Sequence, residues 1–174
     1  MNRFAACGLT AALVLAGASS LAQAADPQRQ SEVARRGPDV MPFSLEATKH
    51  VFTKTARGGI QQVVATDGSD AEQIRLVRQH LQEIRQQFGN GDFSGPAHIH
   101  GHDMPGLAEL RAAPPGVVSV AYKPVDGGAQ LTYSTQDPKL VAALHRWFDA
   151  QLSDHGPDAM EGHQHHHHGE MLKP

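Results

Sequence analysis

The strongest constraint on the fold is an apolar stripe at helical spacing in the middle of the chain. Apolar side chains recur there at three- and four-residue steps: Ile74, Val77, Leu81, Ile84 and Phe88. This spacing predicts a helix with one apolar face that has to be buried. Residues 67–70 offer side-chain oxygens for an N-cap, and a Gly-Asn-Gly stretch at 89–91 ends the pattern.

Two pairs of short strands flank this helix in the sequence. Residues 43–55 and 60–66 read as one hairpin, and residues 117–122 and 130–134 read as another around Asp126-Gly127-Gly128. A last helix is expected from Pro138 to about residue 156. Two hairpins, each followed by a helix, predict an α+β fold: a four-stranded, mainly antiparallel sheet with both long helices on one face.

The N-terminus has the features of a cleaved export signal. Arg3 precedes an apolar run at 9–21, and Ala22-Gln23-Ala24 is typical of a cleavage site. We therefore expect a periplasmic protein that begins near residue 25 and has no membrane segment after cleavage. The only cysteine, Cys7, lies in the segment that is removed, so the mature chain has no thiol for a disulfide or a metal.

The remaining chain divides into three parts. Residues 25–40 are polar, contain two prolines and are expected to form a flexible arm. Residues 41–156 form the single α+β domain, and residues 157–174 form a disordered histidine-rich tail. A formal net charge of −3 gives no indication of nucleic-acid binding, whereas 12 histidines are an unusually large number.

The sharpest motif is His98-Ile99-His100-Gly101-His102, followed by Asp103 and Met104. In an extended segment the side chains alternate, so the three imidazoles would project to one side and Ile99 into the core. Imidazole binds Cu(II), Zn(II) and Ni(II), and a thioether favours Cu(I). The motif therefore predicts a metal site, with copper ahead of zinc or nickel.

A second group of histidines lies in the tail: His163, His165, His166, His167 and His168. Such tracts bind metals with modest specificity because a flexible chain imposes no coordination geometry. We expect this group to collect metal for the defined site, within a protein that buffers copper or delivers it to a periplasmic metal exporter or chaperone.

The separate histidines leave an alternative open. His50, His80 or His145 could serve a bound haem or a small metalloenzyme centre, and one of them could complete the metal site. His155 is expected to cap the end of the last helix. No phosphate loop, nucleophile motif or dinucleotide motif is present, so a binding protein is expected rather than an enzyme. A protective domain with incidental histidines is a third interpretation.

Five segments carry a resemblance: FSLEAT at 43–48, RLVRQHL at 75–81, GDFSGP at 91–96, HGHDMPGL at 100–107 and ALHRWFDAQL at 143–152. They resemble a little-characterised family of small proteobacterial periplasmic proteins. Some members are labelled aspartate carbamoyltransferase, but the Ser-Thr-Arg-Thr phosphate-binding motif of that enzyme is absent here. The resemblance implies export and the extent of the domain, and it implies no reaction.

Overall fold

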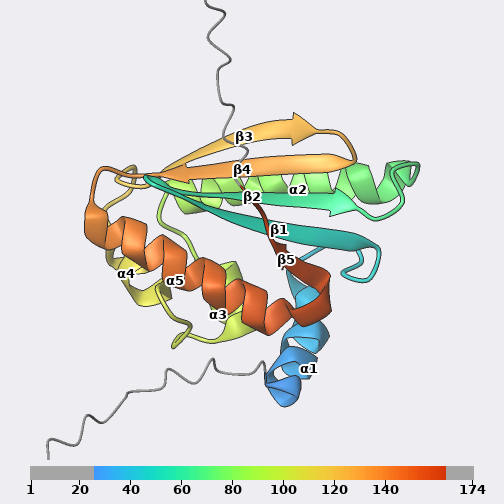
Figure 1. Ribbon diagram of the computed structural model, residues 1–174, viewed down its shortest axis with the longest axis horizontal. Coiled ribbons are helices and arrows are strands. Elements are labelled where there is room, and N and C mark those ends of the chain that lie inside the picture. Colours follow the sequence, from blue (N-terminus) through green and yellow to red (C-terminus); the bar gives the residue numbers. More distant parts are fainter. Residues whose placement is uncertain (1–25, 164–174) are drawn as a thin grey trace, which may run out of the picture.

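The computed structural model describes residues 26–163 and shows an α+β fold (Figure 1). In chain order its elements are α1 (Pro27–Arg36), η1 (Gly37–Asp39), β1 (Thr48–Thr55), β2 (Gly58–Ala65), α2 (Ala71–Gly89), α3 (Ser94–His100), α4 (Leu107–Ala112), β3 (Ser119–Val125), β4 (Gly128–Ser134), α5 (Pro138–His155), η2 (Gly156–Asp158) and β5 (Ala159–Glu161). The α+β class, the two hairpins and the two long helices expected from the sequence are confirmed.

The sheet differs from the prediction in the number of its strands. Within the described residues it has five strands in the order β3-β4-β2-β1-β5, and β5 runs parallel to β1 while the other pairs are antiparallel. The fifth strand comes from the segment that was expected to be tail. Three residues have too little apolar content to signal a strand, and β5 forms because the end of α5 brings it to the free edge of β1.

Both long helices begin at the side-chain caps that their sequences offer. Asp70 accepts a hydrogen bond from the Gln73 amide at 3.1 Å, and Asp137 accepts one from the Lys139 amide at 2.8 Å. The two helices pack on one face of the sheet. Tyr133 of β4 shows this, because its ring contacts Phe88 of α2 as well as residues of α5.

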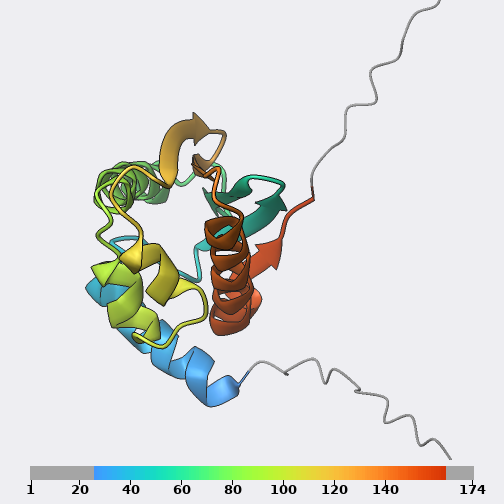
Figure 2. The same cartoon turned by 90° about the vertical axis from the view of Figure 1, so that its left-hand side faces the viewer.

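Residues 25–40 do not form the expected flexible arm. Residues 26–40 contain α1 and η1, and Val33 of α1 is only 1% exposed. Figure 2 shows α1 lying against the ends of α3 and α5. Asp26 caps α1 by accepting a hydrogen bond from the Gln28 amide, so this helix has a local start signal as well as a tertiary contact.

Residues 98–100 of the histidine motif are helical where an extended segment was expected. The Asp92 carboxylate accepts a hydrogen bond from the Ser94 amide at 2.9 Å, and α3 follows directly with Pro96 in its first turn. Gly101, with φ of 84°, ends the helix. Residues two apart on a helix point about 200° apart around its axis. His98 and His100 therefore point in different directions, and the expectation of one shared face was wrong.

Candidate functional site: a histidine-lined cavity

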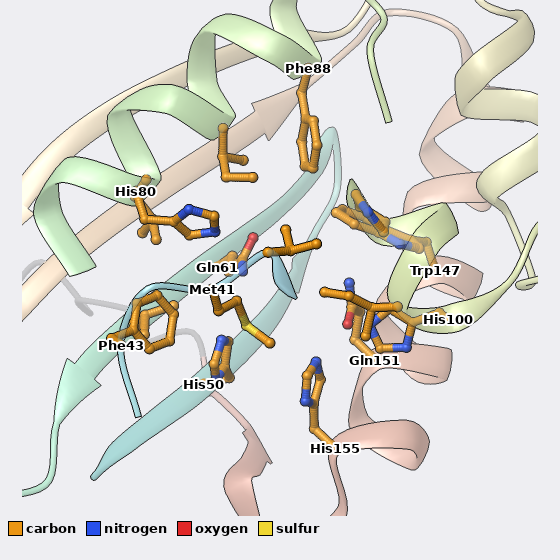
Figure 3. Close-up of a pocket in the computed structure, with 16 residues that line it drawn as sticks. Met41, Phe43, His50, Gln61, His80, Phe88, His100, Trp147, Gln151 and His155 are labelled. Atoms are coloured by element: carbon orange, nitrogen blue, oxygen red, sulfur yellow. The ribbon is translucent and has the colours of Figure 1, made fainter. Parts of the chain in front are cut away.

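A cavity of about 50 Å³ lies between the two long helices and the sheet (Figure 3). Its polar lining comes from five elements: His50, Gln61, His80, His100, Gln151 and His155. Trp147, Met41, Phe43 and Phe88 are among its apolar walls. A space of this size holds a few water molecules or one small ligand.

The four histidines of the cavity are all buried. His50 is 3% exposed, His100 2%, His155 7% and His80 8%. Three buried polar atoms around them lack a hydrogen-bond partner: His50 Nδ1, Trp147 Nε1 and Gln151 Oε1. Buried polar atoms are nearly always paired, so unpaired ones that line one cavity indicate a place for a ligand or ordered water.

Three of these imidazoles form a compact cluster. The ring centres of His50 and His155 are 5.0 Å apart with almost parallel planes, and those of His100 and His155 are 5.1 Å apart with planes at 78°. They come from β1, α3 and α5, which are far apart in sequence. We call His50, His100 and His155 the histidine cluster.

A carboxylate outside the cavity fixes the orientation of His100. His100 Nδ1 lies 2.8 Å from Asp154 Oδ2, and the Arg29 guanidinium pairs with the same carboxylate at 2.9 Å. Because the carboxylate accepts, the Nδ1 proton of His100 donates, and in the neutral ring Nε2 then carries the lone pair. Burial raises the pKa of Asp154, but the hydrogen bonds from His100 and Arg29 outweigh it and hold this pKa below its ordinary value.

Burial keeps the other cavity histidines neutral. Burial, with smaller contributions from His80, His100 and Lys49, lowers the pKa of His50 to about 4. Burial is also the main cause that lowers the pKa of His155 well below its ordinary value, and it lowers the pKa of His80. Neutral imidazole is the form that binds metals, so this state is ready for ligation at neutral pH.

The structure separates the residues of the predicted motif. His98 is exposed and lies 3.0 Å from Asp39, and His102 is exposed with its Nδ1 2.9 Å from Arg111. Asp103 is exposed, whereas Met104 is 2% exposed and packs in the core. Of the predicted ligands in this motif, only His100 lines the cavity.

The histidine-rich tail lies mostly beyond the described residues. His163 is exposed just after β5. The other four tail histidines, at 165–168, lie outside the described residues, so their predicted collecting role stays a prediction.

The separate histidines have three different roles. His50 and His80, which the sequence left as alternatives, both line the cavity. His155 ends α5 as expected, but its ring packs into the cavity against His50 instead of capping the helix. His145 lies apart, because its Nε2 is 3.0 Å from the Thr55 carbonyl and 2.9 Å from the Gly58 carbonyl.

We expect His145→Ala to destabilise the fold without affecting the cavity. One N–H shared by the Thr55 and Gly58 carbonyls holds α5 to the β1–β2 turn, and the substitution removes this contact. The expected cost is about 1–2 kcal/mol in the free energy of unfolding, measured by urea titration. Arg146→Ala, which removes an exposed ion pair to Glu109, is the control and should cost less than about 1 kcal/mol. Equal costs would contradict this role for His145.

Two other findings concern the described residues as a whole. Across 26–163, no group of three or more His, Cys, Asp or Glu side chains already converges as a metal-holding set. In the same range, no helix combines the length and apolar composition needed to cross a membrane.

Comparisons with known protein families, with curated proteins and with solved structures found no match. The function therefore has to be inferred from the chemistry of the cavity.

Proposed function

We propose that this protein binds one transition-metal ion in the cavity, with His50, His100 and His155 as ligands and copper as the preferred metal. The observation that carries the proposal is the histidine cluster itself: three buried imidazoles, two of them with strongly lowered pKa values, around a cavity that contains unpaired polar atoms. Buried polar groups nearly always have hydrogen-bond partners. Buried imidazoles around a cavity with unpaired polar atoms therefore support a bound ligand there.

Two of the three ring pairs, His50 with His155 and His100 with His155, have a spacing that fits a shared ion. Two imidazoles that bind one ion at about 2.0–2.1 Å in a tetrahedral site place their ring centres roughly 5 Å apart, close to the 5.0 and 5.1 Å of the cluster. The perpendicular planes of His100 and His155 suit this arrangement. The parallel rings of His50 and His155 do not, so one of them has to rotate about its χ2 torsion, which is a soft torsion in histidine.

The surroundings of the cluster support ligation by specific atoms. The Asp154 carboxylate holds His100 through Nδ1 and leaves Nε2 for the metal, which is the usual arrangement around metal-bound histidine. His50 Nδ1 is an unpaired ring nitrogen, and Gln151 Oε1 is a further unpaired oxygen.

The lining favours copper over zinc or nickel. Figure 3 shows the Met41 side chain beside His50, where its thioether sulfur could join the three imidazoles. Imidazole alone suits zinc, copper and nickel, whereas imidazole together with a thioether suits Cu(I). The single cysteine of the chain, Cys7, belongs to the expected export signal and lies outside the described residues.

In the cell, such a site would buffer copper or pass it on. Export to the periplasm, collection of metal by the tail histidines and delivery to an exporter or chaperone belong to this proposal, and they follow from the sequence features alone.

Titration of the full chain with its five tail histidines replaced by glutamine tests the proposal. We expect one tight equivalent of Cu(I), with weaker binding of Zn(II) and Ni(II), and X-ray absorption should show two or more imidazole ligands. The unmodified chain should take up additional, weaker equivalents through its tail. Absence of a tight equivalent after the tail substitutions would contradict the proposal, because binding would then reside in the tail.

A haem-binding function is the second candidate. Its support is that His50 and His80 both line a cavity with aromatic walls. The cavity would have to widen considerably to admit a haem, which is why the metal ion ranks first. A Soret band in the absorption spectrum of the purified protein would displace the copper proposal.

A further inference from the structure

The helix α1 is attached to the rest of the fold mostly by polar contacts. Val33 is its one buried residue. Arg29 donates hydrogen bonds to both carboxylate oxygens of Asp154, at 3.1 and 2.9 Å, and to the His100 carbonyl. Gln30 donates to a backbone carbonyl of α5 at 2.9 Å. An element that buries so little apolar surface opens at a lower free energy than the elements that build the core.

Two hollows lie against α1, and both reach Asp154. The smaller one, of about 230 Å³, is lined by Ser31 and Val33 of α1 and by His155 of α5, and we call it the α1 crevice. The larger one, of about 570 Å³, is lined by Arg29 of α1 and by Ser153 of α5. A helix that belongs to a close-packed core leaves no hollows of this size beside it. The helix α1 therefore rests on the body of the protein without a tight fit.

His155 lies between the α1 crevice and the cavity. Among the described residues it is the one that lines both. Its ring centre is 5.0 Å from that of His50, and Figure 3 shows its side chain at the end of α5, pointing towards His50. Gly156 follows it and ends the helix. A molecule in the α1 crevice is therefore separated from the cavity by the end of α5 and this side chain.

Arg29 ties together the two helix ends beside this boundary. Its guanidinium bridges the last carbonyl of α3, at His100, and the carboxylate of Asp154, which precedes His155 in the sequence. Asp154 also accepts the hydrogen bond from His100 Nδ1 at 2.8 Å. Hydrogen bonds between charged groups are the strong ones, so this one side chain supplies a large part of what holds α1 in place. Movement of α1 away from α5 would widen the crevice beside His155.

We propose that α1 is a lid on the cavity. Arg29 latches it to Asp154, and small molecules pass from the α1 crevice into the cavity beside His155 when the latch opens. The route serves any small occupant of the cavity. This inference therefore goes beyond the proposed metal and does not rest on it.

The fluorescence of the one tryptophan tests the latch. Trp147 lines the cavity and is 1% exposed, so its quenching by acrylamide reports how often the cavity opens to a small uncharged molecule. In the full chain without added metal, Arg29→Gln should raise the quenching constant on the order of tenfold, because hydrogen bonds to a charged group are lost. Arg35→Gln removes an exposed arginine of the same helix and should leave the constant unchanged. Equal constants in Arg29→Gln and the parent chain would overturn the proposal.

Two phenylalanine variants test the route. Ser31→Phe places a large side chain in the α1 crevice, and Ser153→Phe places the same side chain in the larger hollow. Both serines are exposed, so neither substitution disturbs the core. We expect Ser31→Phe to lower the quenching constant below that of the parent chain and Ser153→Phe to leave it unchanged. Equal effects of the two variants would overturn the route past His155.

Hydrogen exchange of the parent chain covers the case in which Arg29→Gln fails to fold. The amides in the interior of α1 should exchange faster than those of α2 under native conditions, because the lid opens without global unfolding. Equal protection of α1 and α2 would mean that α1 opens only when the whole protein unfolds, and the lid would be overturned.

Discussion

His155→Gln is expected to weaken Cu(I) binding by at least about 100-fold in the chain whose tail histidines are replaced by glutamine. Loss of a residue that merely supports a ligand typically costs 10- to 100-fold in metal affinity, and loss of a ligand should cost at least the upper value. His155 contacts both other members of the histidine cluster, at ring-centre distances of 5.0 and 5.1 Å. Its removal therefore leaves no pair of neighbouring rings at this spacing.

The matched control comes from the histidine motif. His98→Gln and His102→Gln alter exposed histidines that lie two residues on either side of His100, and each should leave the affinity within about twofold. Competition with a chromophoric Cu(I) chelator measures the affinities, and circular dichroism checks that each variant is folded. A loss in the His98 and His102 variants together with unchanged binding in His155→Gln would favour the linear motif and contradict the cavity.

The elements with strong local signals were predictable from the sequence. The apolar stripe of α2 and the two-residue turn at Asp126-Gly127 specify their structures through periodicity and turn chemistry, and the structure confirms them. The helix α1 was missed because its single buried apolar residue, Val33, makes no periodic pattern. That helix is held mainly by its contacts with the rest of the fold, which a local pattern does not contain.

The histidine motif was misread because two periods fit the same five residues. Alternation suits a strand, but Asp92 and Ser94 start a helix immediately before the motif. If Asp92-x-Ser94-x-Pro96 is interpreted as a helix N-terminus, the motif is predicted to be helical. His98 and His100 then point in different directions.

The histidine cluster itself was beyond local reasoning. Its members come from β1, α3 and α5, and only the packing of these elements brings them together. One signal was present in α5: Gln151 and His155 continue the apolar face of the helix, one and two turns after Trp147, with polar side chains. Polar residues on a face that must be buried indicate a site, and this pattern could have placed His155 in it.

Acidification should destabilise the metal-free protein strongly between pH 6.5 and 4. The pKa of His50 falls from 6.5 to about 4 on folding. The unfolded chain therefore binds this proton more tightly than the folded chain. The contribution of neutral His50 to the free energy of unfolding is complete above pH 6.5 and is lost as the pH falls towards 4. At about 1.4 kcal/mol per pH unit, His50 alone accounts for a loss of about 3 kcal/mol.

Burial is the main cause of the lowered His50 pKa, and neighbouring groups add to it. His80 on α2, His100 on α3 and Lys49 on its own strand all disfavour its protonation, and the lowered pKa of His155 adds a loss of the same sign. Urea titrations of the metal-free chain at pH 7.5 and 4.0 measure the total. His50→Leu should reduce the loss between these two pH values by about 3 kcal/mol, whereas His98→Gln should leave it unchanged. An equal loss in His50→Leu would mean that His50 is not buried in its neutral form, and the cavity would then lack one of its three proposed ligands.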